Sequence, residues 1–326
     1  MRVPTASEIL DGDRAALARA ITLVESSRPE HTRLATDLID DLLPHTGRAK
    51  RIGISGTPGV GKSTFIEALG GHLTSCGERV AVLAIDPSSQ RTGGSILGDR
   101  TRMTTLSRDP NAFIRSTPSS GVLGGVGAQT FATRLLCEAA GYTVVLIETV
   151  GVGQSETTVG DLTDLFLLLV APAGGDDLQG IKRGVMEMAD LIAINKADGA
   201  NVPAAEITRN DYRAALSLVR PKWPGHPTEV STCSAQDNTG IKETWQALDE
   251  RWAALDHGGR LAQIRRDQAV RAFRRDVTDG VLKLVIGPGG QAGSVDVERA
   301  ENDVSAGTIS PLGAALRVID SFANRL

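Results

Sequence analysis

A glycine-rich segment at residues 51–64, RIGISGTPGVGKST, constrains the fold of this chain more than any other stretch. A short apolar run opens it, a helix-compatible run follows it, and its Gly-x-x-x-x-Gly-Lys-Ser spacing is that of the Walker A phosphate-binding loop. Its glycines let successive backbone N–H groups face one anion at the positive end of a helix dipole. A plain glycine-rich turn would leave the complete motif unexplained. The expected nucleotide-binding residues are Gly56, Thr57, Pro58, Gly59, Val60, Gly61, Lys62, Ser63 and Thr64.

Two side chains of this motif carry specific chemistry. Lys62 is expected to reach the β- and γ-phosphates of a nucleotide, and the Ser63 hydroxyl is expected to ligate Mg²⁺. The segment therefore predicts a nucleotide bound together with Mg²⁺.

A second motif, NKAD at residues 195–198, follows an apolar run and selects the base. The Asp198 carboxylate can accept hydrogen bonds from N1 and the exocyclic amino group of guanine, a pattern that adenine cannot satisfy, so GTP is expected. The Lys196 stem can lie over the base, and Asn195 can tie this loop to the phosphate-binding loop. A four-residue match alone could be an ordinary strand end, but a Walker A motif lies about 130 residues upstream. The expected base-contacting residues are Asn195, Lys196, Asp198, Ser234 and Ala235.

A third motif, ETVG at residues 148–151, directly follows a predicted strand. GTPases usually have Asp-x-x-Gly here, with the carboxylate on Mg²⁺ through water and the glycine N–H at the γ-phosphate. The longer Glu148 can still reach the metal, and Gly151 is where the amide is needed. Val152 stands where small signalling GTPases have a water-orienting glutamine, so intrinsic hydrolysis is expected to be slow. Gln154, a partner or a conformational change could complete the site.

Two further carboxylates, Asp86 and Asp99, are candidates for metal-water ligands or for positioning the attacking water. Alternatively, Asp86 is a turn residue before proline and Asp99 a helix N-cap. The stretch at 172–182 is either another mobile loop near the nucleotide or a turn with a capped helix. The candidate catalytic residues are Lys62, Asp86, Asp99, Glu148 and Gly151, and the candidate metal ligands are Ser63, Asp86, Asp99 and Glu148.

The central part of the chain alternates strand-like and helical runs, which predicts βαβ units in an α/β fold. We expect a P-loop NTPase with a mostly parallel sheet covered by helices on both faces. Only 3% of the residues are aromatic, and Ala, Val, Leu and Ile supply the apolar fraction, as suits buried parallel strands. The expected strands are 52–55, 80–85, 112–116, 143–148, 165–170, 191–195 and 228–231.

The two ends of the chain have different patterns. Helices are expected over 7–26 and 29–43, forming an extension packed on the main domain or, alternatively, a partner-binding arm. A long helix over 260–285 precedes a Gly/Pro break, a loop over 291–308 and a final helix over 311–322. The predicted domains are an N-terminal extension at 1–45, a GTPase domain at 46–259 and a C-terminal arm at 260–326.

The long C-terminal helix carries a run of arginines and an apolar stripe. The arginines are interpreted as the solvated face of an amphipathic helix. Because nothing in the sequence covers the apolar stripe, self-association is expected. The arginines stand at positions 260, 265, 266, 271, 274 and 275, and the apolar residues at 261, 264, 273, 277, 281 and 284.

Composition limits the partners and the compartment. The net charge of −4 gives no general attraction to nucleic acid. The three cysteines, at 76, 137 and 233, have neither disulfide nor metal-site spacing. The first thirty residues contain Asp11, Asp13 and Glu25 and no continuous apolar core, and no apolar run is long enough to span a membrane. A soluble cytoplasmic protein is expected, without nucleic-acid or membrane partners.

Taken together, the motifs resemble the MeaB/ArgK family of P-loop GTPases, which includes the methylmalonic aciduria type A protein. The resemblance spans nearly the whole chain and includes two stretches that are not general GTPase motifs, ETVGVGQSE and GGDDLQGIK. It implies a homodimeric, Mg²⁺-dependent GTPase that escorts an adenosylcobalamin-dependent acyl-CoA mutase and gates cofactor delivery, with methylmalonyl-CoA mutase as the expected client. The other matching stretches are GTPGVGKST, AVLAIDPSS, GDRTRM, NKAD, the helical N-terminus and the basic C-terminal arm.

The resemblance also implies roles for individual residues. Lys62 matches the family's Walker A lysine, Asp86 and Asp99 its two switch I carboxylates, and Glu148 its switch II glutamate. A third switch matches residues 174–182, and its polar members are Asp176, Gln179 and Lys182.

Three other functions are alternatives to this one. A metal-insertion GTPase would usually carry a Cys- or His-rich site near switch I, and the five histidines here are scattered. A kinase or ATPase linked to arginine or ornithine transport is disfavoured by the NKAD motif. A regulatory GTP-binding module without significant catalysis stays open.

Overall fold

The computed structural model describes residues 2–26, 28–86, 103–118, 125–149, 159–172, 183–286, 294–306 and 308–323. The chain divides into two compact units, Met1–Ala269 and Val270–Leu326. Helix α12 (Arg260–Ile286) begins in the first unit and ends in the second. The domain boundaries expected after residues 45 and 259 stay predictions.

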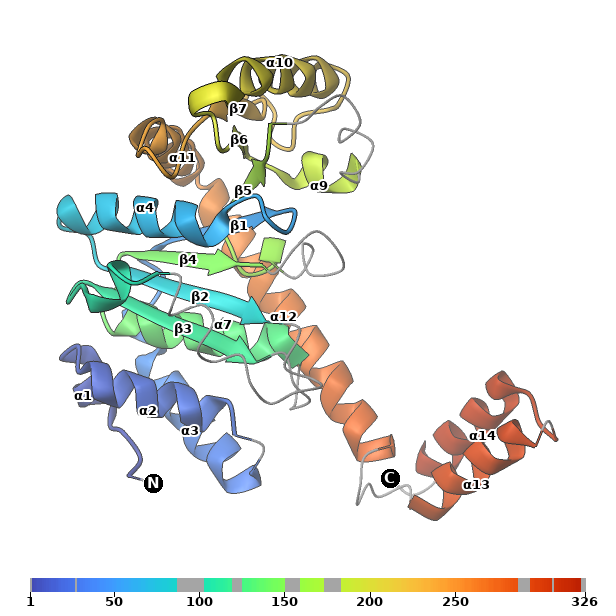
Figure 1. The fold of residues 1–326 in the computed structure, drawn as a ribbon. Coiled ribbons are helices and arrows are strands. Elements are labelled where there is room, and N and C mark those ends of the chain that lie inside the picture. Colours follow the sequence, from blue (N-terminus) through green and yellow to red (C-terminus); the bar gives the residue numbers. More distant parts are fainter. Residues whose placement is uncertain are drawn as a thin grey trace. The chain divides into compact units, whose positions relative to one another are not determined.

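A parallel β-sheet forms the centre of the first unit (Figure 1). Within the described residues it has seven strands in the order β3-β2-β4-β1-β5-β6-β7, and all seven expected strands are present. Because every pairing is parallel, the loops that follow the strands emerge at one edge, where such sheets bind ligands. The strands are β1 (Lys50–Gly56), β2 (Val80–Asp86), β3 (Ala112–Pro118), β4 (Val144–Glu148), β5 (Leu165–Val170), β6 (Leu191–Ile194) and β7 (Glu229–Thr232).

Helices cover both faces of the sheet, as the α/β pattern predicted (Figure 1). Apolar side chains of α4 (Lys62–Ser75) and α11 (Ile241–His257), such as Phe65 and Leu248, are buried on one face. The other face packs against the N-terminal helices and three more helices. These are α7 (Gly125–Ala139), α9 (Arg183–Met188) and α10 (Val202–Ser217).

The N-terminal segment folds as three helices that share the core of the first unit. The single helix expected over 7–26 is wrong, because the chain turns at Gly12 with φ +77 and Asp13 then caps a new helix by accepting a hydrogen bond from Ala15 N at 2.7 Å. The helix expected over 29–43 is confirmed. The elements are α1 (Ala6–Leu10), α2 (Arg14–Val24) and α3 (Pro29–Leu42).

The second unit consists of the end of α12 with α13 (Ser294–Ser305) and α14 (Pro311–Ala323). The long helix and the final helix are confirmed. The loop expected over 291–308 is wrong over α13, because Val297, Ala300 and Val304 recur at helical spacing and line one apolar cavity of about 880 Å³ with α14.

Two buried aspartates begin neighbouring strands and anchor distant elements. Asp164, before β5, accepts hydrogen bonds from Arg51 N and from Trp252 Nε1, both at 3.0 Å. Asp190, before β6, accepts one from Trp223 Nε1 at 2.6 Å. Each carboxylate therefore ties a strand to a helix or loop that lies far away in the sequence.

Five charged side chains form a buried ionic cluster at the start of β1 and β5. Glu138 accepts hydrogen bonds from Arg51 Nε and Arg134 Nη1, both at 2.8 Å, and Asp164 accepts from Arg265 Nη2 at 2.6 Å. Burial would raise the pKa of both carboxyls, but the arginines outweigh it and hold each pKa below its usual value. The expected solvated face of α12 is therefore wrong for Arg265.

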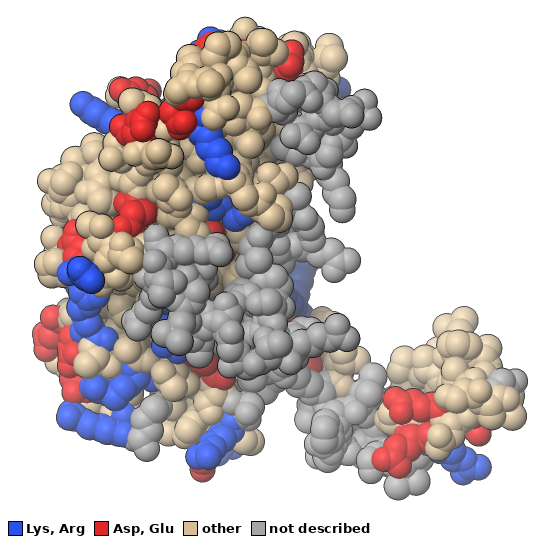
Figure 2. All heavy atoms as spheres, viewed as in Figure 1, with Lys and Arg blue, Asp and Glu red and all other residues tan. Residues whose placement is uncertain are grey.

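The described surface mixes both signs of charge on the face drawn in Figure 2. Among the described residues, none of the helices combines the length and apolar character needed to cross a bilayer.

Candidate nucleotide site

The phosphate-binding loop joins β1 to α4 and leaves no space for side chains at two of its glycines. A Cβ added at Gly56 would lie 2.5 Å from the carbonyl O of Leu169. One at Gly61 would lie 2.8 Å from Asn195 Nδ2, and the φ of +94 at Gly61 is itself unfavourable for other residues. Gly56 and Gly61 are thus required because a side chain would collide with the backbone of β5 at the first position and with the Asn195 side chain at the second.

Lys62, the first residue of α4, folds back over the loop. Its Nζ donates to the carbonyl O of Gly56 at 2.8 Å and of Thr57 at 3.3 Å. Burial lowers the pKa of Lys62, while Glu148 acts in the opposite direction. A phosphate placed beside this ammonium would offset the cost of its burial, because it supplies the missing counter-charge.

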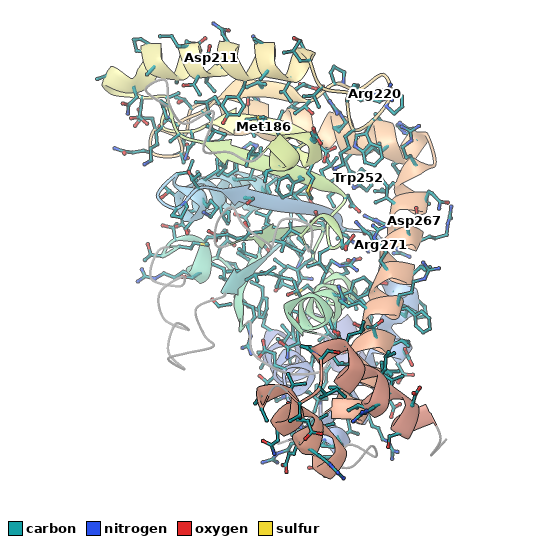
Figure 3. All side chains as sticks on the ribbon, turned by 90° about the vertical axis from the view of Figure 1, so that its right-hand side faces the viewer. Met186, Asp211, Arg220, Trp252, Asp267 and Arg271 are labelled. Carbon is teal, nitrogen blue, oxygen red and sulfur yellow. The ribbon has the colours of Figure 1, made fainter. Side chains whose placement is uncertain are left out.

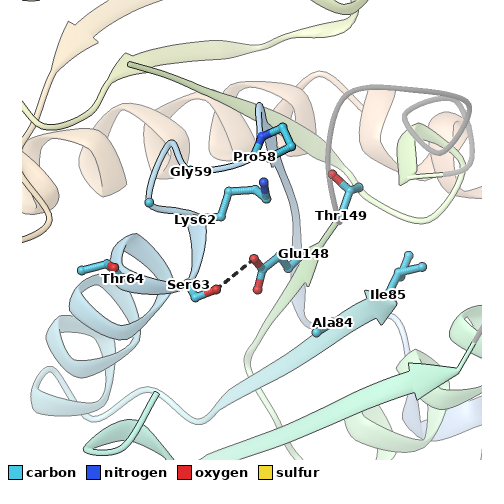
Figure 4. A pocket seen from close by; sticks show the side chains of 10 residues that line it. Pro58, Gly59, Lys62, Ser63, Thr64, Ala84, Ile85, Glu148 and Thr149 are labelled. Atoms are coloured by element: carbon cyan, nitrogen blue, oxygen red, sulfur yellow. Dashed lines mark hydrogen bonds between the residues drawn. The ribbon is translucent and has the colours of Figure 1, made fainter. Parts of the chain in front are cut away.

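Ser63 and Glu148 lie next to each other on the wall of the cavity beside the loop (Figure 4). Ser63 Oγ donates to Glu148 Oε1 at 3.3 Å. Next to Glu148, Thr149 Oγ1 donates to Ser55 Oγ at 2.8 Å and so fixes the end of β4 against β1. The cavity has a volume of about 630 Å³ and is lined by Pro58, Gly59, Gly61, Lys62, Ser63, Thr64, Ala84, Ile85, Glu148 and Thr149.

These oxygen donors fit Mg²⁺. The ion prefers oxygen ligands, keeps several waters and is usually held through one or two side chains together with substrate phosphates. Ser63 and Glu148, which share the cavity wall with Lys62, would hold it directly or through water. Asp86 ends β2 beside β4, so its backbone lies at the same edge of the sheet.

The NKAD loop and the loop after β7 form one hydrogen-bonded unit. Asp198 Oδ2 accepts from Ser234 Oγ at 2.6 Å, and Ser234 Oγ in turn accepts from Asp237 N at 3.1 Å. The backbone of Ser234 also pairs with Thr239 in both directions. This arrangement fixes the carboxylate that is expected to read the base.

Asn195 links the phosphate loop to the base loops, as its sequence position predicted. Its side chain is 1% exposed; Nδ2 donates to Val60 O at 2.9 Å, and Oδ1 accepts from Ala235 N at 3.1 Å. Lys196 adopts φ +62, and its Nζ donates to Gly59 O at 2.7 Å. Both residues thus contact the phosphate loop.

Sequence reasoning missed Glu67 on α4. Its Oε1 accepts from the backbone N–H groups of Thr105 at 2.7 Å and Leu106 at 3.2 Å. Leu106 also lies so close to α4 that a Cβ at Gly70 would be 2.5 Å from its Cδ2. α4 therefore anchors the chain just after the GDRTRM stretch. A single glutamate on a helix gave no sequence signal for this contact.

Among the described residues, no group of three or more His, Cys, Asp or Glu side chains could hold a metal ion. Several expected site residues lie outside the described residues. The side chain of Asp86 also falls outside the description. The other residues outside it are Asp99, Gly151, Val152, Gln154, Asp176, Gln179 and Lys182.

Comparisons with known proteins agree with this geometry. The family model "Methylmalonyl Co-A mutase-associated GTPase MeaB" matches residues 17–289. GTPase ArgK of Escherichia coli is 52% identical over 271 residues, which cover 83% of this chain and 82% of that protein. The mitochondrial methylmalonic aciduria type A homolog of Caenorhabditis elegans is 44% identical over 96% of this chain and 81% of its own length.

A solved structure described as a LAO/AO transport system kinase has a similar fold over almost the whole chain. The TM-score is 0.76 at 39% identity, covering 98% of this chain and 96% of the other. With this fold, the phosphate and base loops and these matches, the chain belongs to the MeaB family of P-loop GTPases, the methylmalonyl Co-A mutase-associated GTPases.

Proposed function

We propose that the chain binds GTP with Mg²⁺ and hydrolyses it to GDP and phosphate. The observation that carries this proposal is the position of Asn195, which donates to the phosphate loop and accepts from the base loop. One side chain therefore sets the distance between the phosphate site at Lys62 and the base site at Asp198.

The residues divide the chemistry between them. Lys62 would neutralise phosphate charge, Ser63 and Glu148 would hold the metal, and Asp198 would accept hydrogen bonds from guanine. Bound Mg²⁺ would supply positive charge that stabilises the phosphates. Asp86, Asp99 and Gly151 are proposed to complete the metal and γ-phosphate contacts. Since Val152 replaces the usual glutamine, unassisted turnover is slow.

The proposed biological role is that of a chaperone for an adenosylcobalamin-dependent acyl-CoA mutase, expected to be methylmalonyl-CoA mutase. The description of the matching family and the names of the relatives support it. GTP turnover would gate cofactor delivery, with Asp176, Gln179 and Lys182 reporting on the partner as a third switch. The cytoplasmic location stays a prediction.

We also propose that the protein acts as a homodimer through its C-terminal unit. Phe273 is 66% and Leu312 72% exposed, and the apolar cavity between α12, α13 and α14 is open to a partner. A second copy would cover these side chains. Sedimentation analysis of the parent and of Phe273→Asp tests this, and a parent that stays monomeric at micromolar concentration overturns it.

A transport-linked kinase is a second candidate, because the structurally similar protein carries that description. Such a role requires ATP, whereas the Asp198 carboxylate, fixed by Ser234 at 2.6 Å, suits guanine. Titration with GTP and ATP separates the two: binding of ATP at least as tightly as GTP would favour the kinase.

The decisive experiment measures GTP turnover of the purified protein with and without an adenosylcobalamin-dependent acyl-CoA mutase. Acceleration by the mutase is expected. Turnover that the mutase leaves unchanged would count against the chaperone role, while GTP binding measured alongside would show whether the nucleotide assignment still holds.

A further inference from the structure

The turn at residues 159–164 packs directly on the strand that leads into the phosphate loop. Val159 O accepts from Leu162 N and from Thr163 Oγ1, both at 2.9 Å, so the turn is internally braced. On β1, a Cβ added at Gly53 would lie 2.5 Å from Val159 Cγ1 and 3.0 Å from Thr163 Oγ1. The turn and β1 are therefore in such close contact that neither can shift far without the other.

The N-terminal part of helix α12, at Arg265 and Gln268, contacts the same turn. Gln268 is 1% exposed, and its Nε2 donates to Gly160 O at 3.1 Å and to Thr163 O at 2.7 Å. One helical turn earlier, Arg265 donates to both oxygens of Asp164, at 2.9 and 2.6 Å. Figure 3 labels Asp267 and Arg271 on this helix, on either side of Gln268 in the sequence, and Trp252 on α11.

A third element reaches the turn from α9. A Cβ on Gly160 would lie 3.0 Å from Met188 Cε, so the last residue of α9 packs against this glycine. Helix α9 begins at Arg183, directly after the stretch at 174–182. Gly160 is therefore a junction at which the turn, α9 and α12 meet.

We propose that Gln268 is a positioning residue that couples the nucleotide state of the phosphate site to helix α12. The turn packs on β1, the strand that leads into the phosphate loop, so its position depends on that wall of the phosphate site. Because the junction is close-packed, a displaced turn must carry Gln268 with it or break two hydrogen bonds. The coupling rests on the proposed GTP function and is reciprocal, so a partner that moves α12 alters nucleotide preference.

Hydrogen exchange of the α12 amides tests this coupling in the full-length protein. We expect the parent to exchange at different rates with GDP and with a non-hydrolysable GTP analogue. Gln268→Met keeps the side-chain length but removes both donated hydrogen bonds, and we expect that nucleotide-dependent difference to be lost. Gln263→Met is the matched control on the same helix, since Gln263 is exposed and bonds only within the helix, donating to Asp267 and accepting from Arg266; it should keep the difference.

A second variant approaches the junction from its other side. Gly160→Ala brings a methyl group against the mobile end of Met188, and we expect the ratio of the GDP and analogue dissociation constants to change by about fivefold or more. This variant decides the matter if Gln268→Met does not fold. The coupling is overturned if the variants keep the parent's ratio of GDP and analogue dissociation constants and also keep the nucleotide-dependent difference in α12 exchange.

Nucleotide binding by the parent separates the two proposals. If the parent binds both nucleotides and its α12 exchange does not differ between them, Gln268 has no coupling role, while the GTP function stands. If the parent binds neither nucleotide, the proposed function fails and the coupling fails with it.

Discussion

Asn195 donates from its side-chain amide to the carbonyl O of Val60 at 2.9 Å, across 135 residues of sequence. This hydrogen bond joins the end of β6 to the phosphate loop, while the amide oxygen accepts from Ala235. Because Asn195 is buried and satisfied at both ends, the fold itself sets the distance between the phosphate-binding loop and the loop after β7.

Replacing Lys62 by alanine should strongly lower the rate of GTP hydrolysis. The ammonium is held over the loop by the carbonyls of Gly56 and Thr57, and losing one preorganised charge typically costs about 10²–10³-fold in rate. Steady-state GTP hydrolysis and nucleotide titration measure the effect, with Lys242→Ala, an exposed position on α11, as the control. Unchanged kinetics would remove the phosphate-loop assignment.

Asp198→Asn should shift base preference from guanine to xanthine. The change turns a pair of acceptors into one donor and one acceptor, so GTP binding should weaken by about 10- to 100-fold. Competition between GTP and xanthosine triphosphate is the measurement. Asp237→Asn is the control, because only the backbone of Asp237 bonds to Ser234. A variant that binds GTP as well as the parent does would refute the base-reading role.

Asp164→Asn should destabilise the first unit. Asp164 accepts from Arg265, Trp252 and the Arg51 backbone, and removing one member of a buried ion pair costs about 3–5 kcal/mol in the free energy of unfolding. Urea denaturation measures the loss. The exposed Asp267→Asn on α12 should stay within about 0.5 kcal/mol of the parent; equal stability of both variants contradicts the prediction.

Acid should destabilise the protein through Glu138 and Asp164. The pKa of each is below the usual values of 4.5 and 3.8 in the folded state. Their contribution to stability is therefore fully present above these values and is lost as the pH falls through the lower folded pKa. Thermal unfolding between pH 7 and pH 3 should show this fall, and Glu138→Gln, less stable at neutral pH, should show a smaller one. A midpoint that rises with acidification would contradict it.

Chelation of Mg²⁺ should abolish hydrolysis, because Ser63 and Glu148 offer oxygen ligands suited to that ion. With Mg²⁺ restored, the protein alone should turn over GTP on the order of 10⁻⁴ to 10⁻² s⁻¹, the range of unassisted P-loop GTPases. Phosphate release in EDTA and after adding excess Mg²⁺ measures both quantities. Turnover of several per second by the free protein would show that Val152 does not limit the reaction.

Local patterns predicted the sheet and the two nucleotide motifs, because buried strands and phosphate loops have strong short-range signatures. The helix break at Gly12 and Asp13 has no such signature, because the apolar periodicity continues on both sides of the turn. Residues of α13 are mostly polar, which favours a loop, although Val297, Ala300 and Val304 give it an apolar face against α14.

Contacts between distant residues had no local signal at all. The arginine-rich pattern of α12 places Arg265 on a solvated helix face, yet it pairs with Asp164 across 101 residues. Likewise, Glu67 binds the backbone of Thr105 only because α4 and that segment meet in space. Such pairings depend on the topology of the sheet and become visible only once the strands are placed.

The hydrogen bonds of Trp252 to Asp164 and of Trp223 to Asp190 have an optical consequence. An indole emits at a wavelength set by the charges beside its ring, and each of these rings donates to a buried carboxylate that begins a strand. Trp252 shares Asp164 with Arg265 of α12, and Trp223 lies at the start of β6. The unlabelled protein thus carries intrinsic fluorescent reporters at the two buried aspartates that precede β5 and β6.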